Sequence, residues 1–237
     1  RDVEKLLCIL PFEEKWFKEH GVEQTTYVGH PLLDVVREPH RAAVGDANFS
    51  RKVIALLPGS RRQEIKRMLP VMLSMIRQFN EYQFVVAGAP GIPADFYQQF
   101  LAGKKRVSLV QDKTRDVLRL ADAAIVTSGT ATLETALHGV PQVVCYKGNG
   151  LSYFIAKRLI KVPYISLVNL ILENKLVEEL IQGNCNEDKL SDALGKILMP
   201  SEITRIRAGY DDLRQKLGKP GASERAAAAI LDVLRKN

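Results

Sequence analysis

The chain has 237 residues, 46% of them hydrophobic, and carries a formal net charge of +7. This hydrophobic share is ample for a packed core and excludes a disordered chain. The positive charge favours an anionic partner, namely nucleic acid, an acidic membrane surface or a phosphorylated small molecule. Nucleic acid is the weakest of these, because no run of five basic residues occurs and basic residues do not interleave with aromatic ones.

Cysteine usage and hydropathy exclude further classes. Cys8, Cys145 and Cys185 are widely spaced, which suits a reducing cytoplasm and fits neither a disulfide framework nor a metal-binding cysteine motif. The apolar runs stay well below the roughly 18 residues that a membrane-spanning helix requires. The chain opens with Arg1 and shows no signal-peptide pattern, so we expect a piece of a longer protein.

The amino-terminal segment predicts the last strand-helix-strand unit of a sheet, with a strand at 5–10, a helix at 12–19 and a strand at 25–28. Residues 29–34 then leave that sheet, and the polar segment 37–51 reads as a linker. His30 precedes Pro31 here; a place at a domain hinge near substrate and a purely structural role both remain open.

From Lys52 onward, strands alternate with helices. This alternation indicates right-handed crossovers and a parallel α/β sheet, whose ligands bind beyond the carboxyl ends of the strands. We expect strands at 52–57, 83–87, 107–110, 123–126 and 142–145, and helices at 64–79, 94–101, 114–120 and 130–137.

The first of these strands runs into Pro58-Gly59-Ser60-Arg61. Gly59 lets the backbone come close to a ligand, Ser60 and the following N–H groups can donate to phosphate oxygens, and Arg61 offers a planar fork suited to phosphate. The turn matches neither the Walker fingerprint nor the dinucleotide fingerprint, since both glycine patterns are absent from the chain. It therefore indicates an anion site without naming the anion.

A second turn, Ser128-Gly129-Thr130, lies between strand 123–126 and helix 130–137. Its free N–H groups and the positive end of the helix dipole would face a ligand together, and Glu134 could accept hydrogen bonds from sugar hydroxyls beside a phosphate. The alternative is that Thr130 is only an N-cap and Glu134 only an exposed acid of the first turn. The presence of the first turn favours the ligand site.

The rest of the sequence gives few indications of a chemical function. Helix 152–160 has a basic face that either rests on an acidic membrane or is simply solvated. Asn169 is a polar residue inside an apolar run. It is either a buried residue with a structural role or a residue that contacts the ligand. We expect further helices at 175–181, 187–198, 203–217 and 223–234, the last with Ser223 as its N-cap.

Six segments together resemble the lipid-A-disaccharide synthase family, in order and over nearly the whole chain. They are Gly29-His30-Pro31-Leu32-Leu33-Asp34, Leu56-Leu57-Pro58-Gly59-Ser60-Arg61, Thr127-Ser128-Gly129-Thr130-Ala131-Thr132-Leu133-Glu134, Val140-Pro141-Gln142-Val143-Val144-Cys145-Tyr146, and Ala156-Lys157-Arg158-Leu159-Ile160 followed by Ile165-Ser166-Leu167-Val168-Asn169-Leu170.

The resemblance implies a GT-B glycosyltransferase with two Rossmann-like domains, helices covering both faces of the donor-domain sheet, and a helical carboxyl-terminal tail. Such an enzyme joins UDP-2,3-diacylglucosamine to 2,3-diacylglucosamine 1-phosphate, giving the β-1,6 disaccharide 1-phosphate and UDP. Residues 1–48 would then be the end of the acceptor-side domain with the linker, 49–200 the UDP-sugar domain and 201–237 the carboxyl-terminal helices. The resemblance also suggests a homodimer and peripheral contact with the cytoplasmic face of the inner membrane.

The same resemblance assigns roles to the two turns. The diphosphate would bind Gly59, Ser60, Arg61 and the turn Ser128-Gly129-Thr130, the ribose would bind Glu134, and Tyr146 and Asn169 would lie at the donor. Arg61 would stabilise the leaving group without a metal or cofactor, since no Asp-x-Asp occurs. The general base is expected outside this chain. Open alternatives are an N-acetylglucosaminyltransferase, a UDP-GlcNAc 2-epimerase and a non-catalytic nucleotide-binding module.

Overall fold

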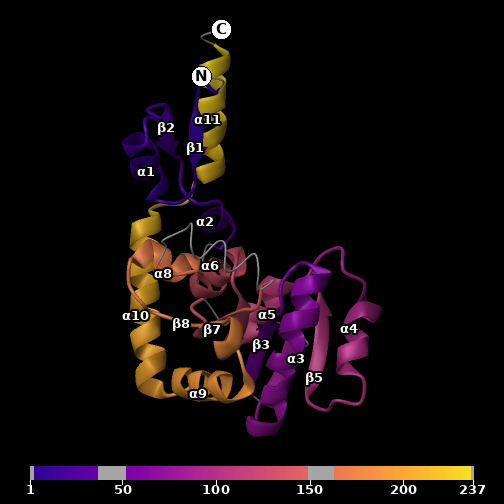
Figure 1. Ribbon diagram of the computed structural model, residues 1–237. Coiled ribbons are helices and arrows are strands. Elements are labelled where there is room, and N and C mark those ends of the chain that lie inside the picture. Colours follow the sequence, from indigo (N-terminus) through magenta and orange to yellow (C-terminus); the bar gives the residue numbers. More distant parts are fainter. Residues whose placement is uncertain (1–2, 37–51, 149–162, 236–237) are drawn as a thin grey trace.

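The computed structural model describes residues 3–36, 52–148 and 163–235 (Figure 1). It contains two separate parallel sheets. A small sheet pairs β1 (Leu6–Cys8) with β2 (Thr25–Tyr27), and α1 (Glu13–Glu19) connects them. This confirms the predicted strand-helix-strand unit. The predicted linker 37–51 and the predicted basic helix 152–160 lie outside the described residues.

The second sheet has six parallel strands in the order β5-β4-β3-β6-β7-β8. The strands are β3 (Val53–Leu57), β4 (Gln83–Gly88), β5 (Val107–Gln111), β6 (Ala123–Thr127), β7 (Gln142–Tyr146) and β8 (Glu178–Ile181). The chain starts at β3, moves outward to β5, returns to β6 beside β3 and then moves outward in the other direction. This is the doubly wound order, and its reversal point lies between β3 and β6. The predicted α/β class is confirmed.

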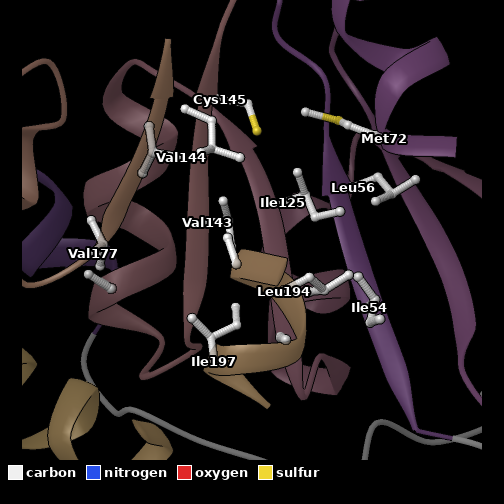
Figure 2. Close-up of a cluster of buried hydrophobic side chains, with 14 of the residues drawn as sticks. Ile54, Leu56, Met72, Ile125, Val143, Val144, Cys145, Val177, Leu194 and Ile197 are labelled. Atoms are coloured by element: carbon white, nitrogen blue, oxygen red, sulfur yellow. The ribbon is translucent and has the colours of Figure 1, made fainter. Parts of the chain in front are cut away.

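Helices cover both faces of this sheet, as predicted. They are α3 (Arg62–Gln78), α4 (Ala94–Leu101), α5 (Thr114–Leu120), α6 (Thr130–Leu137), α8 (Leu167–Leu172), α9 (Glu187–Ile197) and α10 (Pro200–Leu217). Because side chains alternate along a strand, Ile54 and Leu56 pack on one face together with Leu194 of α9 (Figure 2). Val53, Ala55 and Leu57 pack on the other face, where α5 contributes a further part of the core. Burial on both faces explains why these strands are continuous apolar runs.

The sequence prediction was wrong for segment 175–181. We expected a helix, but Glu178–Ile181 forms β8 and pairs in parallel with β7, with Val143 opposite Glu178 and Cys145 opposite Leu180. The residues are good helix formers in isolation. Pairing with β7 and burial of Leu180 override that local preference, which is weak compared with tertiary packing.

The carboxyl-terminal helices connect the two sheets. After α10, helix α11 (Ala222–Leu234) returns to lie beside β1 (Figure 1). Tyr27 donates its hydroxyl to the carbonyl oxygen of Leu217 at 2.9 Å, and Arg225 Nε donates to the carbonyl oxygen of Val28 at 2.8 Å. The end of the chain therefore holds the amino-terminal unit in place.

The predicted N-cap of the last helix was also wrong. Gly221 stands at the N-cap of α11. The capping acceptor is the carboxylate of Asp34, just after the start of α2 (Leu32–Val35), which takes hydrogen bonds from the N–H groups of Gly221, Ala222 and Ser223. Because Asp34 is distant in sequence from the helix that it caps, no local sequence pattern could have predicted this cap.

Candidate functional site

The two predicted turns line one hollow at the reversal point of the sheet. Because Leu57 of β3 pairs with Val126 of β6, the segments that follow these strands leave the same edge side by side. The hollow has a volume of about 420 Å³. Its lining includes every turn residue predicted to bind the ligand, namely Gly59, Ser60, Arg61, Ser128, Gly129 and Thr130, together with the predicted Glu134 of α6.

The first turn is closed by Glu64, a residue that sequence reasoning missed. Its carboxylate Oε2 accepts the N–H of Ser60 at 3.1 Å and that of Arg61 at 3.3 Å, and Oε1 accepts Arg61 Nη1 at 3.2 Å. Gly59 has φ +110°, and a Cβ there would lie 2.7 Å from Glu64 Oε2. The turn therefore requires glycine at 59, both for its conformation and for the closeness of Glu64. A Glu at the third position of a helix is a capping-box signal, and this signal could have identified Glu64.

The guanidinium group of Arg61 remains accessible despite this contact. Its side chain is 82% exposed, and the hydrogen bond to Glu64 uses one of its five N–H donors. The remaining N–H donors of Arg61 can therefore form hydrogen bonds to an anion in the hollow.

The second turn opens α6. Gly129 is its N-cap, with φ +155°, a value that favours glycine. The first N–H groups of a helix have no partner within it, so those of Thr130 and Ala131 face the hollow with the positive end of the helix dipole. Ser128 contributes less than predicted, because its N–H donates to the carbonyl oxygen of Cys145 and its hydroxyl to that of Ile165.

Glu134 lines the hollow from α6, as predicted, but it has an unpredicted partner. Arg115 Nε of α5 lies 3.2 Å from Glu134 Oε1, and the Glu134 side chain is only 18% exposed. An ion pair fixes the carboxylate and leaves Glu134 Oε2 for a further hydrogen bond. Arg115 lies in the first turn of α5, which follows β5 at the same edge of the sheet. That position is the signal that could have found it.

Asn169 is a structural residue, and its predicted contact with the donor is not supported. It is fully buried. Its Nδ2 donates to the carbonyl oxygen of Val177 and to Glu179 Oε1, both at 2.9 Å, while Oδ1 accepts the N–H groups of Leu176 and Val177. All the hydrogen-bonding groups of the amide are thus used to fix the approach to β8.

Tyr146 and His30 also lie away from the lining of the hollow. Tyr146 is the last residue of β7 and is half-buried. His30 is buried beside α2, its Nδ1 accepts the N–H of Leu32 at 3.1 Å, and burial lowers its pKa. For His30 the structure therefore favours the structural alternative.

Within 3–36, 52–148 and 163–235, no cluster of three or more His, Cys, Asp or Glu side chains is placed to hold a metal ion. The helices in these ranges include none long and apolar enough to cross a membrane.

The comparisons with solved structures support the fold. A Staphylococcus aureus MnaA–UDP structure superposes with a TM-score of 0.64 at 13% identity, over 98% of this chain and 60% of that one. A UDP-GlcNAc 2-epimerase from Neisseria meningitidis, bound to UDP-GlcNAc, gives 0.60 at 12% identity, over 99% of this chain and 61% of that one. At such identities the likeness shows shared architecture alone.

Sequence comparisons identify the family. A lipid-A-disaccharide synthase of Syntrophus aciditrophicus (strain SB) is 40% identical over 99% of this chain, and one of Geobacter sulfurreducens is 37% identical over 100% of this chain. The chain spans 64% of each of these relatives. The profile of the family described as lipid-A-disaccharide synthetase matches residues 1–233. The chain therefore belongs to the lipid-A-disaccharide synthetase family.

Proposed function

We propose that this chain is the donor-binding part of a lipid-A-disaccharide synthase. The whole enzyme would transfer 2,3-diacylglucosamine from UDP-2,3-diacylglucosamine to 2,3-diacylglucosamine 1-phosphate, forming the β-1,6 disaccharide 1-phosphate and UDP. Family membership supports the reaction. The observation that carries the donor site is the shared hollow, in which Arg61 and the start of α6 lie together at the reversal point of the sheet.

In this proposal the diphosphate of the donor lies between the two turns. The Arg61 guanidinium and the N–H groups of Thr130 and Ala131 bind its oxygens, and Glu134, fixed by Arg115, accepts the ribose hydroxyls. Transfer forms a bond from the acceptor 6-hydroxyl oxygen to the sugar C1. It breaks the bond from C1 to the phosphate oxygen, which keeps the electron pair. The hydroxyl proton goes to a general base outside this chain.

The chemical contribution of the hollow is to stabilise UDP as it leaves. Negative charge on the diphosphate increases as the bond to the sugar breaks, so fixed donors bind the transition state more strongly than the ground state. Arg61 and the positive end of α6 take the place of a cation. We infer an inverting, metal-independent glycosyltransferase, without a cofactor.

The amino-terminal unit is the proposed end of the acceptor-side domain, with residues 1–48 including the linker, 49–200 forming the donor domain and 201–237 the final helices. A two-stranded sheet alone is marginally stable, and β1 and β2 form such a sheet. Several large apolar residues of this unit are exposed, among them Trp16 at 52%. Both features suit a unit completed by a further part of the protein. This chain alone would then bind the donor without turnover.

Association with the cytoplasmic face of the inner membrane and homodimerisation belong to the same proposal. The net charge of +7 favours an anionic surface. Ile230, Leu231 and Leu234 are more than half exposed on α11, which provides an apolar face for a partner copy.

Two experiments test the proposal. Calorimetric titration of the chain with UDP, ADP and GDP should show saturable binding with preference for UDP, and equal or absent binding would reject the donor site. Full-length protein should then form disaccharide 1-phosphate from the two lipid substrates. Conversion of UDP-GlcNAc to its 2-epimer would favour the epimerase alternative, and UDP binding without either reaction a non-catalytic module.

A further inference from the structure

A second polar cavity lies at the opposite end of α6 from the donor hollow. Helix α6 begins at Thr130 in the hollow and ends at Leu137, with His138 as its C-cap. The cavity has a volume of about 350 Å³, and it opens between the end of α5, the end of α6 and one side of α10. Its polar lining comprises Arg119, His138, Arg207, Tyr210, Asp211 and Arg214, and we call it the arginine cavity.

The arginine cavity is rich in cationic donors. Arg207 Nε donates to the carbonyl oxygen of Gly139 at 3.3 Å, and Arg214 Nη2 donates to that of Leu137, so the end of α6 holds both groups in place. Arg119 Nη1 lies 3.3 Å from the Asp116 carboxylate. Within the described part of the chain, each guanidinium makes one such bond and has five N–H donors. Donors toward the cavity are therefore in excess.

The negative charge nearby does not balance these cations. Asp211 is the one carboxylate among the described residues that line the cavity, and Asp116 pairs with Arg119 from outside the lining. The carbonyl groups at the end of α6 add the equivalent of about half a negative charge. Three guanidinium groups thus face about two and a half opposing charges, and the side chains that line the cavity themselves are net positive.

His138 supplies an independent sign of a missing partner. The residue is 7% exposed, and neither ring nitrogen has a hydrogen-bond partner among the described residues. Burial, and then the charges of Arg119, Arg115 and Arg214, lower its pKa to about 4, so the ring is neutral at pH 7. A neutral imidazole offers one donor and one acceptor, and buried polar atoms without partners are rare.

We propose that the arginine cavity binds a small phosphate-type anion through Arg119, Arg207 and Arg214, with His138 among the residues that line it. This site is separate from the donor hollow and does not depend on the proposed glycosyl transfer. The same chemistry is presented by free inorganic phosphate and by the phosphodiester headgroup of an acidic phospholipid. The anion would neutralise the guanidinium groups and thereby raise the pKa of His138.

The test follows the His138 ring by NMR while inorganic phosphate is added at constant ionic strength. We expect a saturable shift of the His138 signals in the millimolar range and a rise of its pKa by at least one unit. Arg207→Gln and Arg119→Gln should each weaken this response at least tenfold. Arg67→Gln, which removes the same charge from an exposed site on α3, and Arg61→Ala in the donor hollow should leave it unchanged.

Absence of a saturable His138 response up to 20 mM phosphate would overturn the proposal, as would equal affinities in Arg207→Gln and Arg67→Gln. Co-sedimentation with phosphatidylcholine vesicles containing phosphatidylglycerol separates the sources. Weaker vesicle binding of Arg207→Gln than of Arg67→Gln identifies the lipid headgroup as the ligand. Equal vesicle binding, with the phosphate response lost only in Arg207→Gln, identifies free phosphate.

Discussion

The Glu64 carboxylate occupies the N–H groups of Ser60 and Arg61, at 3.1 and 3.3 Å, inside the hollow proposed for a diphosphate. It is an anion of the protein itself at a place suited to a ligand anion. Glu64 orders the turn and at the same time opposes a second negative charge beside it.

We predict that Glu64→Gln binds UDP more tightly than the wild type, by about tenfold, or roughly 1.4 kcal/mol. The amide keeps an acceptor for the Ser60 N–H, so the turn survives while the repulsion of phosphate is lost. Calorimetry with UDP measures the change. Glu81→Gln removes the same charge at an exposed site and should leave the affinity unchanged. Weaker binding in Glu64→Gln would show that Glu64 only orders the turn.

Arg61 should carry much of the affinity for the diphosphate. Loss of a charged hydrogen bond in Arg61→Ala should weaken UDP binding by about 2 kcal/mol, whereas weak uridine binding should not change. Competition of UDP, UMP and uridine against a fluorescent UDP derivative measures this difference, with Arg67→Ala as the charge-matched control. Unchanged UDP affinity in Arg61→Ala would remove Arg61 from the site.

Glu134 and Arg115 should act as a pair on the ribose. Glu134→Gln should weaken UDP about tenfold and 2′,3′-dideoxy-UDP hardly at all, because the lost acceptor serves the hydroxyls. Arg115→Ala should show the same selectivity, since it releases the carboxylate that the 3.2 Å ion pair fixes. The two losses should not add in the double variant. Equal losses for both nucleotides would place Glu134 away from the ribose.

Asn169 should affect stability and leave nucleotide affinity unchanged. Asn169→Leu leaves the N–H of Val177 without its acceptor and the Val177 carbonyl without its donor, and it leaves the N–H of Leu176 with only the carbonyl oxygen of Asn174, at 3.2 Å. The free energy of unfolding should fall by about 3 kcal/mol in urea titrations, while the folded fraction keeps its UDP affinity. Asn184→Ala, at an exposed position, is the matched control. If the variant instead lost UDP affinity and kept its stability, the result would support the predicted contact between Asn169 and the donor.

The contact of Asp34 with α11 predicts an acid-sensitive attachment. Hydrogen bonds from the Ser223 N–H, the Gly221 N–H and the Ser223 hydroxyl hold the pKa of Asp34 well below its usual value. Its stabilisation is therefore present above the ordinary pKa of about 4 and decreases as the pH falls toward the folded-state value.

Asp34→Asn should lower Tm at pH 7, and the difference from wild type should narrow below about pH 4 as the wild-type carboxylate takes up a proton. Differential scanning calorimetry from pH 3 to 7 measures both effects. Asp212→Asn, exposed on α10, should show no such pattern. If the difference in Tm between the variant and the wild type stayed constant over this pH range, the contribution of Asp34 would come from its packing and not from its charge.

The five strands between residues 53 and 146 and both ligand turns were predictable, because each rests on a local pattern. Apolar runs such as 53–57 mark buried strands, and the turns at Gly59 and Gly129 need glycine. The rule that ligands bind at the carboxyl ends of parallel strands then places both turns at one edge.

Other features of the fold and the site could not be predicted, because they depend on contacts between residues that are distant in sequence. The direct neighbourhood of β3 and β6 brings Arg61 and Thr130 into one hollow, and pairing with β7 makes a strand of residues that locally favour a helix. The amide of Asn169 is saturated by the approach to β8, and Asp34 caps a helix almost 190 residues away in sequence. A local pattern reports the preference of a segment for a conformation. The final choice depends on burial and hydrogen bonds that exist only when the segments meet.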